Sequence, residues 1–258
     1  MTALRWNAII LAAGRGPRDR LARAYGVPNK CVIEIAGKPM LAHVAKALHD
    51  SGIVASTLIS IESPSLATTI LGGSAATIPS AGSAPASVIA AIEQKALAYP
   101  VLITTADHPL LTPAMIRYFC QQAEQSSADF TAGLASAETI LAVYPQSIRT
   151  FFRLGKTHLT GCNLFALRNE RGLKLLDRWQ YLEPVRKKPW RLVAAFGLMP
   201  LLRFLVGTLD LDTALAIVSR KLNLQVKAVL MPFPEAAIDV DKPADKELAE
   251  QILKNRSS

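Results

Sequence analysis

A short apolar run near the N-terminus ends abruptly in a glycine-rich turn that carries arginines. Residues 6–12 have the length of a buried strand, and Gly14 and Gly16 end it. Glycine lets the backbone turn tightly, and consecutive N–H groups in such a turn can hold an anion. Arg15 and Arg18 add forked cationic donors that suit phosphate oxygens. The stretch predicts a strand leading into a polyphosphate-binding loop, although a plain strand end would explain the glycines equally well.

The turn matches neither of two common phosphate-binding motifs. It lacks the Gly-Lys-Ser/Thr ending of a P-loop. Asp19 stands where a dinucleotide-binding turn would have its third glycine. The rest of the chain must therefore decide which ligand the turn serves.

Strand-like and helix-like segments alternate through the first half of the chain. Strands are expected at 6–12, Val54–Ile61 and Val101–Thr105, and helices at 39–50, Ser87–Ala98 and Pro113–Gln125 with Thr112 as N-cap. Residues 62–87 leave room for a short helix or strand. This order predicts an α/β fold with a mostly parallel, doubly wound sheet, whose ligand sites lie at the carboxyl ends of the strands.

The second half is less regular. We expect one or two strands in Phe130–Val143, strands at Thr160–Leu167 and Val226–Met231, and helices at Glu170–Trp179 and Ala244–Leu253. The whole chain, residues 1–258, is expected to form a single domain. Residues 168–225 would be a helical, basic and apolar insert within it.

Three carboxylates follow predicted strands. Asp107 comes directly after one, and Asp239 and Asp241 come after the last. Mg²⁺ takes one or two protein carboxylates together with phosphate oxygens, so these residues suit a magnesium–polyphosphate site. A structural alternative stays open for two of them, since Asp107 could cap the next turn and Asp241 the last helix.

Several segments, taken in their order along the chain, together resemble the sequence signature of a known family. They are Leu11-Ala12-Ala13-Gly14-Arg15-Gly16-Pro17-Arg18, Lys30, Gly37-Lys38-Pro39-Met40-Leu41, Gly82 to Ser87, Asp107-His108-Pro109-Leu110, Thr160-Gly161-Cys162-Asn163 and Asp239-Val240-Asp241-Lys242-Pro243-Ala244-Asp245. Together they resemble the signature of the MobA-like and sugar-phosphate nucleotidyltransferases. The resemblance implies a three-layer, Rossmann-like fold of the glycosyltransferase-A type, with a mixed, mostly parallel sheet and an elaborated acceptor-side region.

The resemblance also implies a role for each segment. Arg18 and Lys30 would be catalytic, stabilising charge on the α-phosphate and on the leaving pyrophosphate. Asp107 and Asp241 would hold Mg²⁺, with Asp239 as the alternative to Asp241. The substrates would be bound by Leu11, Ala12, Ala13, Gly14, Arg15, Gly16, Gly82, Ser87, Thr105, Ala106 and Asn163. Among these, Gly82 and Ser87 would face the nucleoside, and Asn163 would lie on the acceptor side.

The implied reaction moves a nucleoside monophosphate from a nucleoside triphosphate to a phosphorylated small-molecule or lipid-linked acceptor. The Leu-Ala-Ala-Gly opening favours CTP or UTP. A glycosyltransferase that uses a nucleotide-sugar, and a non-catalytic protein that binds anionic surfaces, are the alternatives. Aromatic residues make up 6% of the chain and no RNA-binding motif is present, so we do not expect a nucleic-acid partner.

The net charge of +9 is concentrated in one part of the chain. Residues 149–227 contain 15 Lys and Arg against five acids, which predicts contact with an anionic partner or a solvated basic face. Cys31, Cys120 and Cys162 lack metal-type spacing and indicate a reducing, cytoplasmic compartment. The short N-terminal apolar run, closely followed by charges, is not expected to be a signal peptide.

Residues 186–209 fit a plain small-molecule enzyme least well. A basic run leads to Trp190 and Arg191, and a long apolar stretch follows. Arg203 makes a spanning helix improbable, and Pro200 is expected to kink or break any helix there. The segment is either a pair of buried helices or a homo-oligomer contact, or else an interfacial segment that makes peripheral contact with the inner face of the membrane.

Overall fold

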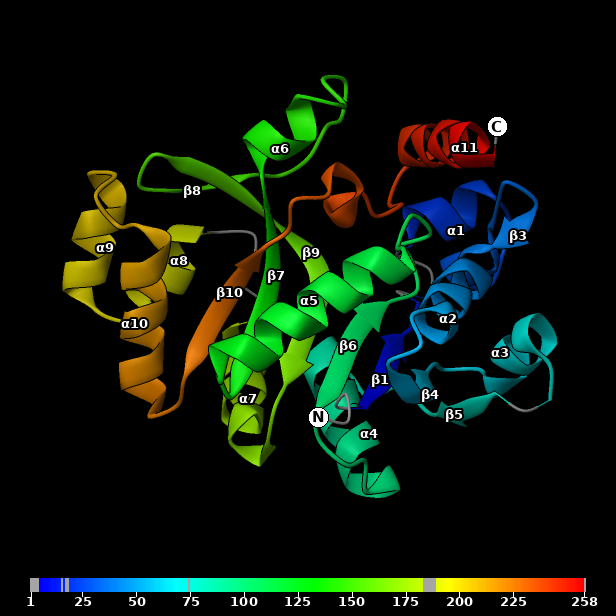
Figure 1. Cartoon of the computed structure of the whole chain (residues 1–258), viewed down its shortest axis with the longest axis horizontal. Coiled ribbons are helices and arrows are strands. Elements are labelled where there is room, and N and C mark those ends of the chain that lie inside the picture. The colour runs from blue at the N-terminus through cyan, green and yellow to red at the C-terminus, as the bar shows by residue number, and fades with distance from the viewer. Residues whose placement is uncertain (1–4, 15, 17–18, 74, 183–188, 258) are drawn as a thin grey trace.

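The computed structural model describes residues 5–14, 16, 19–73, 75–182 and 189–257. Its main sheet contains β1 (Trp6–Leu11), β4 (Val54–Ser60), β5 (Ala76–Ile78), β6 (Val101–Thr105), β7 (Phe130–Ser136), β8 (Phe152–Leu154), β9 (Thr157–Leu167) and β10 (Val226–Leu230). The strand order is β10-β7-β9-β6-β1-β4-β5, and β8 pairs with β9 (Figure 1). A separate two-stranded hairpin is formed by β2 (Glu34–Ile35) and β3 (Lys38–Pro39).

The sheet is mixed but mostly parallel, as predicted. Strand β1 runs parallel to both β4 and β6, and β4–β5 and β7–β10 are also parallel pairs. Strand β9 is antiparallel to β6, β7 and β8. The carboxyl ends of β1, β4 and β6 therefore meet at one edge of the sheet, which is where open α/β folds bind their ligands.

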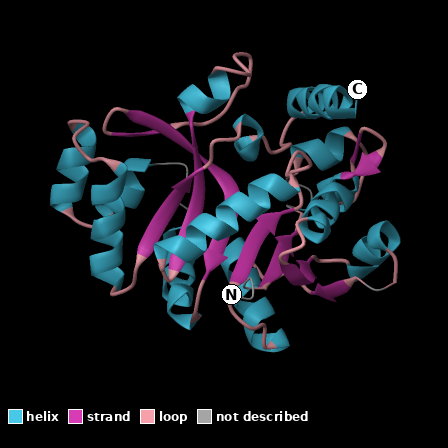
Figure 2. Cartoon of the chain, viewed as in Figure 1, coloured by secondary structure: helices cyan, strands magenta, loops and turns pink. Residues whose placement is uncertain are grey.

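Helices cover both faces of the sheet and complete three layers (Figure 2). On one face lie α2 (Met40–Asp50), α3 (Pro64–Leu71) and α5 (Pro113–Ser126), and on the other α4 (Ala84–Lys95) and α7 (Leu173–Leu182). The remaining α-helices are α1 (Arg20–Ala24), α6 (Ala137–Leu141), α8 (Pro189–Ala194), α9 (Leu198–Leu205), α10 (Leu211–Leu222) and α11 (Pro243–Ser257). Within the described residues, short 3₁₀ turns also occur at η2 (Lys30–Val32), η3 (Glu170–Gly172) and η5 (Pro234–Ala237).

The central strand shows why these residues form a buried sheet. Ala8 and Ile10 of β1 pack in the core beneath α2 and α5, whereas Ile9 packs in the core beneath α4. Successive strand side chains point to opposite faces, so a strand covered on both sides must be apolar throughout. The uninterrupted apolar run at 6–12 is therefore the signature of a doubly covered strand.

Capping side chains determine where two of the predicted helices begin. Thr112 caps α5 by accepting a hydrogen bond from the Met115 N–H, and Pro113 occupies the first helical position. Helix α4 begins at Ala84 rather than Ser87 because Ser83 is its N-cap and accepts from the Ala86 N–H. The segment at 62–87 contains both a helix, α3, and a strand, β5.

One prediction in the middle of the chain was incomplete. Phe130–Val143 holds one strand, β7, and then helix α6, because the Ser136 side chain accepts from the Thr139 N–H and starts a helix. The strand predicted at Thr160–Leu167 is confirmed, and it lies within the longer β9. Asn163 has a φ of 51° there, next to an irregularity in the β7–β9 register.

The insert at 168–225 contains helices α7 to α10, and α8, α9 and α10 form a group at the left edge of the molecule (Figure 1). The expectation that Pro200 breaks a helix was wrong. The helix is interrupted at residues 195–197, between α8 and α9. Pro200 lies in the first turn of α9, where the backbone N–H groups have no partner within the helix, so the N–H that proline lacks is not needed. None of the helices in the described part of the chain is long and apolar enough to cross a bilayer.

Candidate active site

The glycine-rich turn and the first carboxylate lie side by side because their strands are paired. Leu11 at the end of β1 is in register with Thr105 at the end of β6. One step further, the Ala106 N–H donates to the Leu11 carbonyl at 2.9 Å. The turn that begins at Ala12 therefore leaves the sheet next to Asp107.

A backbone hydrogen bond brings the C-terminal acids Asp239 and Asp241 close to Asp107. The Val240 N–H donates to the Asp107 carbonyl at 2.8 Å, which places Asp239 and Asp241 on either side of this contact. Carboxylate oxygens of Asp107, Asp239 and Asp241 all lie within 4.8 Å of one another. We call these three residues the carboxylate cluster. The three metal-binding candidates of the sequence thus come together in one site.

Lys30 closes the carboxylate cluster from the other side. Its Nζ donates to Asp107 Oδ2 at 2.5 Å and to Asp241 Oδ1 at 2.6 Å. Burial disfavours the charged ammonium, but the Asp107 and Asp241 carboxylates outweigh burial and raise the pKa of Lys30 above its usual range. The Thr105 hydroxyl donates to Asp107 Oδ1 at 2.5 Å and fixes the second oxygen of that carboxylate.

Asp239 is held by an arginine that sequence reasoning did not single out. The Arg149 guanidinium donates to the Asp239 carboxylate and backbone, and also to Asp245 Oδ1 at 3.2 Å. Asn163 Nδ2 donates to Asp239 Oδ2 at 3.3 Å, so the predicted acceptor-side residue faces the cluster. Burial and the nearby Asp107 carboxylate nevertheless raise the pKa of Asp239 to about 6. The cluster therefore carries an excess of negative charge that suits a further cation.

Asp245, rather than Asp241, caps the last helix. Its Oδ2 accepts from the N–H groups of Asp241 and Lys242, at 3.1 and 2.9 Å. The structural alternative for Asp241 is therefore wrong, and its side chain is available to Lys30 and to the cluster. Asp245 belongs to the Asp239–Asp245 segment of the family resemblance. The sequence therefore included this residue in the motif but did not indicate that its carboxylate binds these two N–H groups.

The glycine-rich turn has a partner that the sequence did not reveal. The Gly14 N–H donates to both carboxylate oxygens of Glu62, at 3.2 and 3.0 Å. Asn29 Nδ2 donates to the Ala12 carbonyl at 2.7 Å and to Glu62 Oε1 at 2.9 Å. A ligand that uses the Gly14 amide must therefore displace Glu62, the residue that follows the end of β4 by two positions.

The remaining candidates of the turn are only partly described. Ala13 and Gly16 are exposed, and Gly16 has a φ of 55°, a conformation that glycine adopts without strain. Arg15 and Arg18 lie outside the described residues, so their predicted roles stay predictions. Asp19 caps α1, accepting from the N–H groups of Leu21 and Ala22.

The proposed nucleoside loop is shaped by a serine. The Ser87 hydroxyl accepts from the Ala81 N–H at 2.9 Å, and its side chain is buried. This contact ties the turn before α4 to the helix and leaves Gly82 at the surface of the loop, with open space where a Cβ would be. Ser87 thus acts on the loop backbone, whereas direct contact of either residue with a nucleoside stays a prediction.

The three cysteines and His108 are not suited to covalent catalysis. Burial raises the pKa of Cys31 to about 12, and it raises the pKa values of Cys120 and Cys162 as well. Burial also lowers the pKa of His108 to about 4, and its Nε2 lies 3.1 Å from the Glu235 carbonyl. These thiols stay protonated and this imidazole stays neutral at pH 7, so among the described residues the charge of the site comes from its acids, Lys30 and Arg149.

A comparison with known protein families identifies the family to which this chain belongs. The family model of the MobA-like NTP transferase domain matches residues 8–174, which is more than half of the chain. The chain belongs to this family. The matched range contains Lys30 and Asp107. Strand β10, helix α11 and the other two acids of the cluster, Asp239 and Asp241, lie beyond it. This nucleotidyltransferase therefore completes its carboxylate cluster with C-terminal residues outside the matched range.

Solved structures agree with the family assignment. A hypothetical transferase from Thermus thermophilus is 30% identical, with a TM-score of 0.79 over 94% of this chain and 100% of that one. A CMP:2-keto-3-deoxy-manno-octonic acid synthetase complexed with CTP shares the fold at 14% identity and a TM-score of 0.61, covering 98% of this chain and 99% of that one. A 4-diphosphocytidyl-2C-methyl-D-erythritol synthase from Anaerococcus prevotii shares it at 12% identity and a TM-score of 0.58, with the same coverage. The comparison with curated protein sequences gives no match.

Proposed function

We propose that this nucleotidyltransferase moves a nucleoside monophosphate from CTP or UTP to a phosphorylated acceptor, with Mg²⁺ as cofactor and pyrophosphate as leaving group. The observation that carries the proposal is the carboxylate cluster, closed by Lys30, beside a glycine-rich turn. The pyrimidine preference is supported by the Leu-Ala-Ala-Gly opening and by fold neighbours whose names contain a cytidine nucleotide.

The donor set of the cluster fits Mg²⁺. Its ligands are carboxylate oxygens from Asp107 and Asp241, or Asp239, which is the chemistry that a small hard cation prefers. When bound, Mg²⁺ would neutralise charge on the phosphate oxygens during transfer. In the structure, the ammonium of Lys30 lies between Asp107 and Asp241 and offsets part of their charge.

Transfer of this kind requires little covalent help from the protein. An acceptor phosphate oxygen attacks the α-phosphorus in line, a P–O bond forms, and the bond to the β-phosphate breaks as pyrophosphate leaves. Lys30 offsets the charge that develops on the α-phosphate and the leaving group, with Arg18 assigned the same role. We assign Asn163 and Arg149, which both contact Asp239, to holding the acceptor phosphate.

The alternatives to this proposal are weaker. The family assignment argues against a glycosyltransferase and against a non-catalytic binding protein. The Asp210-Leu211-Asp212 segment, which could suggest a glycosyltransferase metal motif, starts helix α10 instead. Asp210 caps that helix by accepting from the Thr213 N–H at 2.8 Å.

The test is thermal unfolding with CTP, UTP, GTP, ATP or dTTP, each with and without Mg²⁺. The protein would be wild type, Asp107→Asn, or the control Asp50→Asn, which changes an exposed ion pair on α2. A nucleotide at a hundredfold excess over its Kd adds about 2.7 kcal/mol to the free energy of unfolding. We expect CTP or UTP to stabilise the wild type and the control, and Mg²⁺ to add to the effect except in Asp107→Asn.

Two outcomes would contradict the proposal. The absence of a shift with any triphosphate would exclude this donor site. A shift that Asp107→Asn leaves unchanged would separate nucleotide binding from the carboxylate cluster. If a nucleotide is identified, pyrophosphate release with that nucleotide and candidate phosphorylated acceptors tests the transfer itself.

A further inference from the structure

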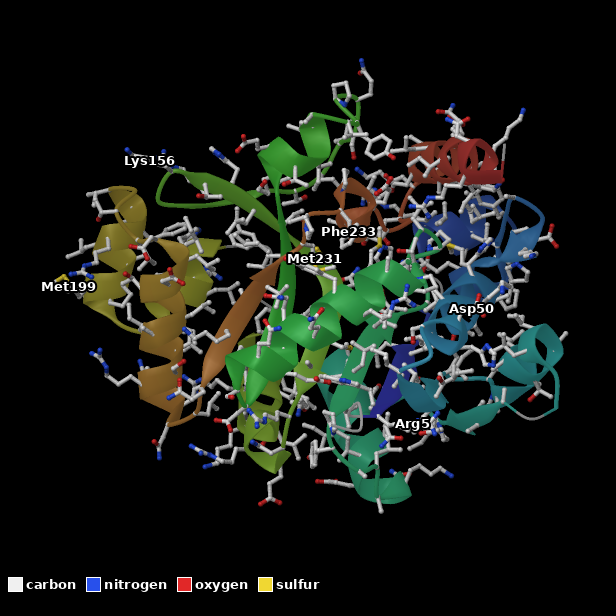
Figure 3. The ribbon with its side chains drawn as sticks, viewed as in Figure 1. Arg5, Asp50, Lys156, Met199, Met231 and Phe233 are labelled. Carbon is white, nitrogen blue, oxygen red and sulfur yellow. The ribbon has the colours of Figure 1, made fainter. Side chains whose placement is uncertain are left out.

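Helix α9 presents an apolar face to solvent. Leu198 and Val206 are each 71% exposed, and Met199, Leu202 and Leu205 between them are also exposed. Residues 198, 202 and 205 are spaced by four and then three, so they lie on one face of the helix. In Figure 3, Met199 lies at the outermost edge of the molecule and its side chain extends away from the body.

The opposite face of α9 is the one that packs. Phe204 is partly buried against the cluster formed by Leu154, Leu159 and Leu209. No residue of α9 is fully buried, although seven of its eight residues are apolar. The helix is therefore anchored from one side only. Of the alternatives for residues 186–209, a pair of buried helices is therefore wrong for α9.

Helix α8 extends the exposed surface. Trp190 is 47% exposed, and the guanidinium carbon of Arg191 lies 5.1 Å from the centre of its ring. We name the group of Trp190, Leu198, Met199, Leu202, Leu205 and Val206 the α8–α9 patch. Scattered exposed apolar residues are ordinary on protein surfaces, but five exposed apolar residues within and at the end of one short helix mark an interaction site.

The charges around the patch are mostly positive. The described segments 152–159 and 189–222, which form β8 with its turn and helices α8 to α10, contain six Lys and Arg side chains and two Asp. Arg203 lies on α9 itself, and Arg153 reaches the end of the helix, close to Gly207. One of the two acids, Asp210, is engaged as a helix cap.

This charge distribution discriminates between the partners that could cover the patch. In a symmetric dimer the same surface meets itself, so two sets of cations would be brought together around the apolar contact. An anionic bilayer offers negative headgroups to the cations and an acyl boundary to the leucines. Tryptophan is enriched at that boundary because its ring is apolar and its N–H is polar.

We propose that the α8–α9 patch is a peripheral membrane-binding surface that docks on an anionic lipid bilayer. Helix α9 lies in the interface plane, with its exposed leucines below the headgroups and Arg191 and Arg203 at phosphate level. A helix this short gives reversible, salt-sensitive binding. The inference does not rest on the proposed reaction.

The experiment is vesicle co-sedimentation of the full chain. The vesicles contain either equal parts of phosphatidylglycerol and phosphatidylcholine or phosphatidylcholine alone, at low salt and at about 1 M salt, where the Debye length falls to about 3 Å. The test variant is Leu202→Gln with Leu205→Gln, which keeps the charge and the helix propensity. The matched control is Leu141→Gln with Val143→Gln, two exposed apolar residues at and just after the end of α6.

We expect the wild type and the control to bind phosphatidylglycerol vesicles at low salt and to be released by high salt. The Leu202/Leu205 variant should bind about tenfold more weakly, with an unchanged unfolding temperature because both leucines are exposed. Its nucleotide-induced thermal shift should equal that of the wild type, so a failure of the membrane proposal stays distinct from a failure of the donor site.

Three outcomes would overturn the proposal. One is a wild type that binds no phosphatidylglycerol vesicles at low salt. Another is a Leu202/Leu205 variant that binds them as well as the control does. The third is sedimentation velocity that shows a dimer at micromolar concentration, converted to monomer by the Leu202/Leu205 substitutions, because the patch would then join two copies of the chain.

Discussion

At the level of single residues, the site is organised by Lys30. Its ammonium lies between Asp107 and Asp241, although it is 77 and 211 positions away from them in the chain. Its side chain and that of Asp107 are 12% and 13% exposed, so water screens this contact poorly. Lys30 therefore stabilises the site without metal and is positioned for charge neutralisation during transfer.

Replacing Lys30 with methionine should separate these two contributions. The variant leaves two acids uncompensated, so we expect a loss of about 3 kcal/mol in the free energy of unfolding without Mg²⁺, at the lower end for a broken buried pair because Asp241 is partly exposed. Mg²⁺ should restore more stability to this variant than to the wild type. Activity should fall by about 10²–10³-fold even with Mg²⁺.

Unfolding temperature and pyrophosphate release measure the two effects. Lys46→Met, which breaks an exposed ion pair with Asp50, should change the free energy of unfolding by less than about 0.5 kcal/mol. A Lys30→Met enzyme with full activity would show that Lys30 is structural only.

Gly14 makes a second residue-level prediction. A Cβ at this position would lie 2.9 Å from Glu62 Oε1 and 3.3 Å from Asn29 Nδ2. The Glu62 carboxylate can swing away, but Asn29 also holds the Ala12 carbonyl and caps the turn that carries Lys30. We therefore expect Gly14→Ala to raise the KM for the nucleotide about tenfold and to cost about 1 kcal/mol of stability.

Steady-state kinetics and thermal unfolding check this expectation. The control is Gly73→Ala, where the added Cβ meets nothing within 4 Å. A KM that is equal in the two variants would mean that the turn does not contact the nucleotide.

At the level of elements, Asp129 connects three parts of the second half of the chain. Its Oδ2 accepts from the Gln225 N–H before β10 at 2.7 Å, and its Oδ1 accepts from Asn169 before η3 at 2.9 Å. Burial would raise the pKa of this carboxyl, but the hydrogen bonds from Gln225 and Asn169 and the nearby Arg171 hold it below its ordinary value of 3.8.

The lowered pKa sets the sign of a pH dependence. Above the unfolded-state value the ionised carboxylate contributes its full stability, and that stability is lost as the pH falls through the lower, folded-state value. We expect Asp129→Asn to lose about 2 kcal/mol near pH 7, or roughly 4–8 °C in unfolding temperature. The difference from wild type should shrink below about pH 4.

Thermal unfolding across pH measures this difference. Asp177→Asn removes the same charge from an exposed position on α7 and should track the wild type at every pH. A penalty for Asp129→Asn that is the same at pH 3 and pH 7 would contradict the assignment.

At the level of the whole molecule, stability is distributed unevenly. Strands β1 and β6 are central and covered on both faces, whereas α9 has no buried residue. Local opening free energies follow such differences in burial. Amide hydrogen exchange, followed by mass spectrometry, should therefore be fastest in α8 and α9 and slowest in β1 and β6. Equal protection of α9 and β6 would mean that another molecule covers the patch in solution.

Much of the fold could be predicted from local sequence. Hydrophobic periodicity indicates the doubly covered strand at 6–12, and capping residues indicate the helix that begins at Pro113. Position along the chain indicates the acids that follow strands. Local signals were insufficient at Phe130–Val143, where Ser136 starts a helix inside an apolar run that also suits a strand. They also left Pro200 ambiguous, because proline breaks a helix interior and suits a first turn.

The sequence by itself determined the order of the elements and which residue types stand at the carboxyl ends of the strands, because both follow from nearest neighbours in the chain. Only the tertiary structure decided that Arg149 holds Asp239, that Glu62 accepts from Gly14, and that Lys30 bridges two acids. It also decided which face of α9 is exposed, since both faces are apolar. Contacts between residues tens to hundreds of positions apart are set by how the layers pack, and no local pattern encodes them.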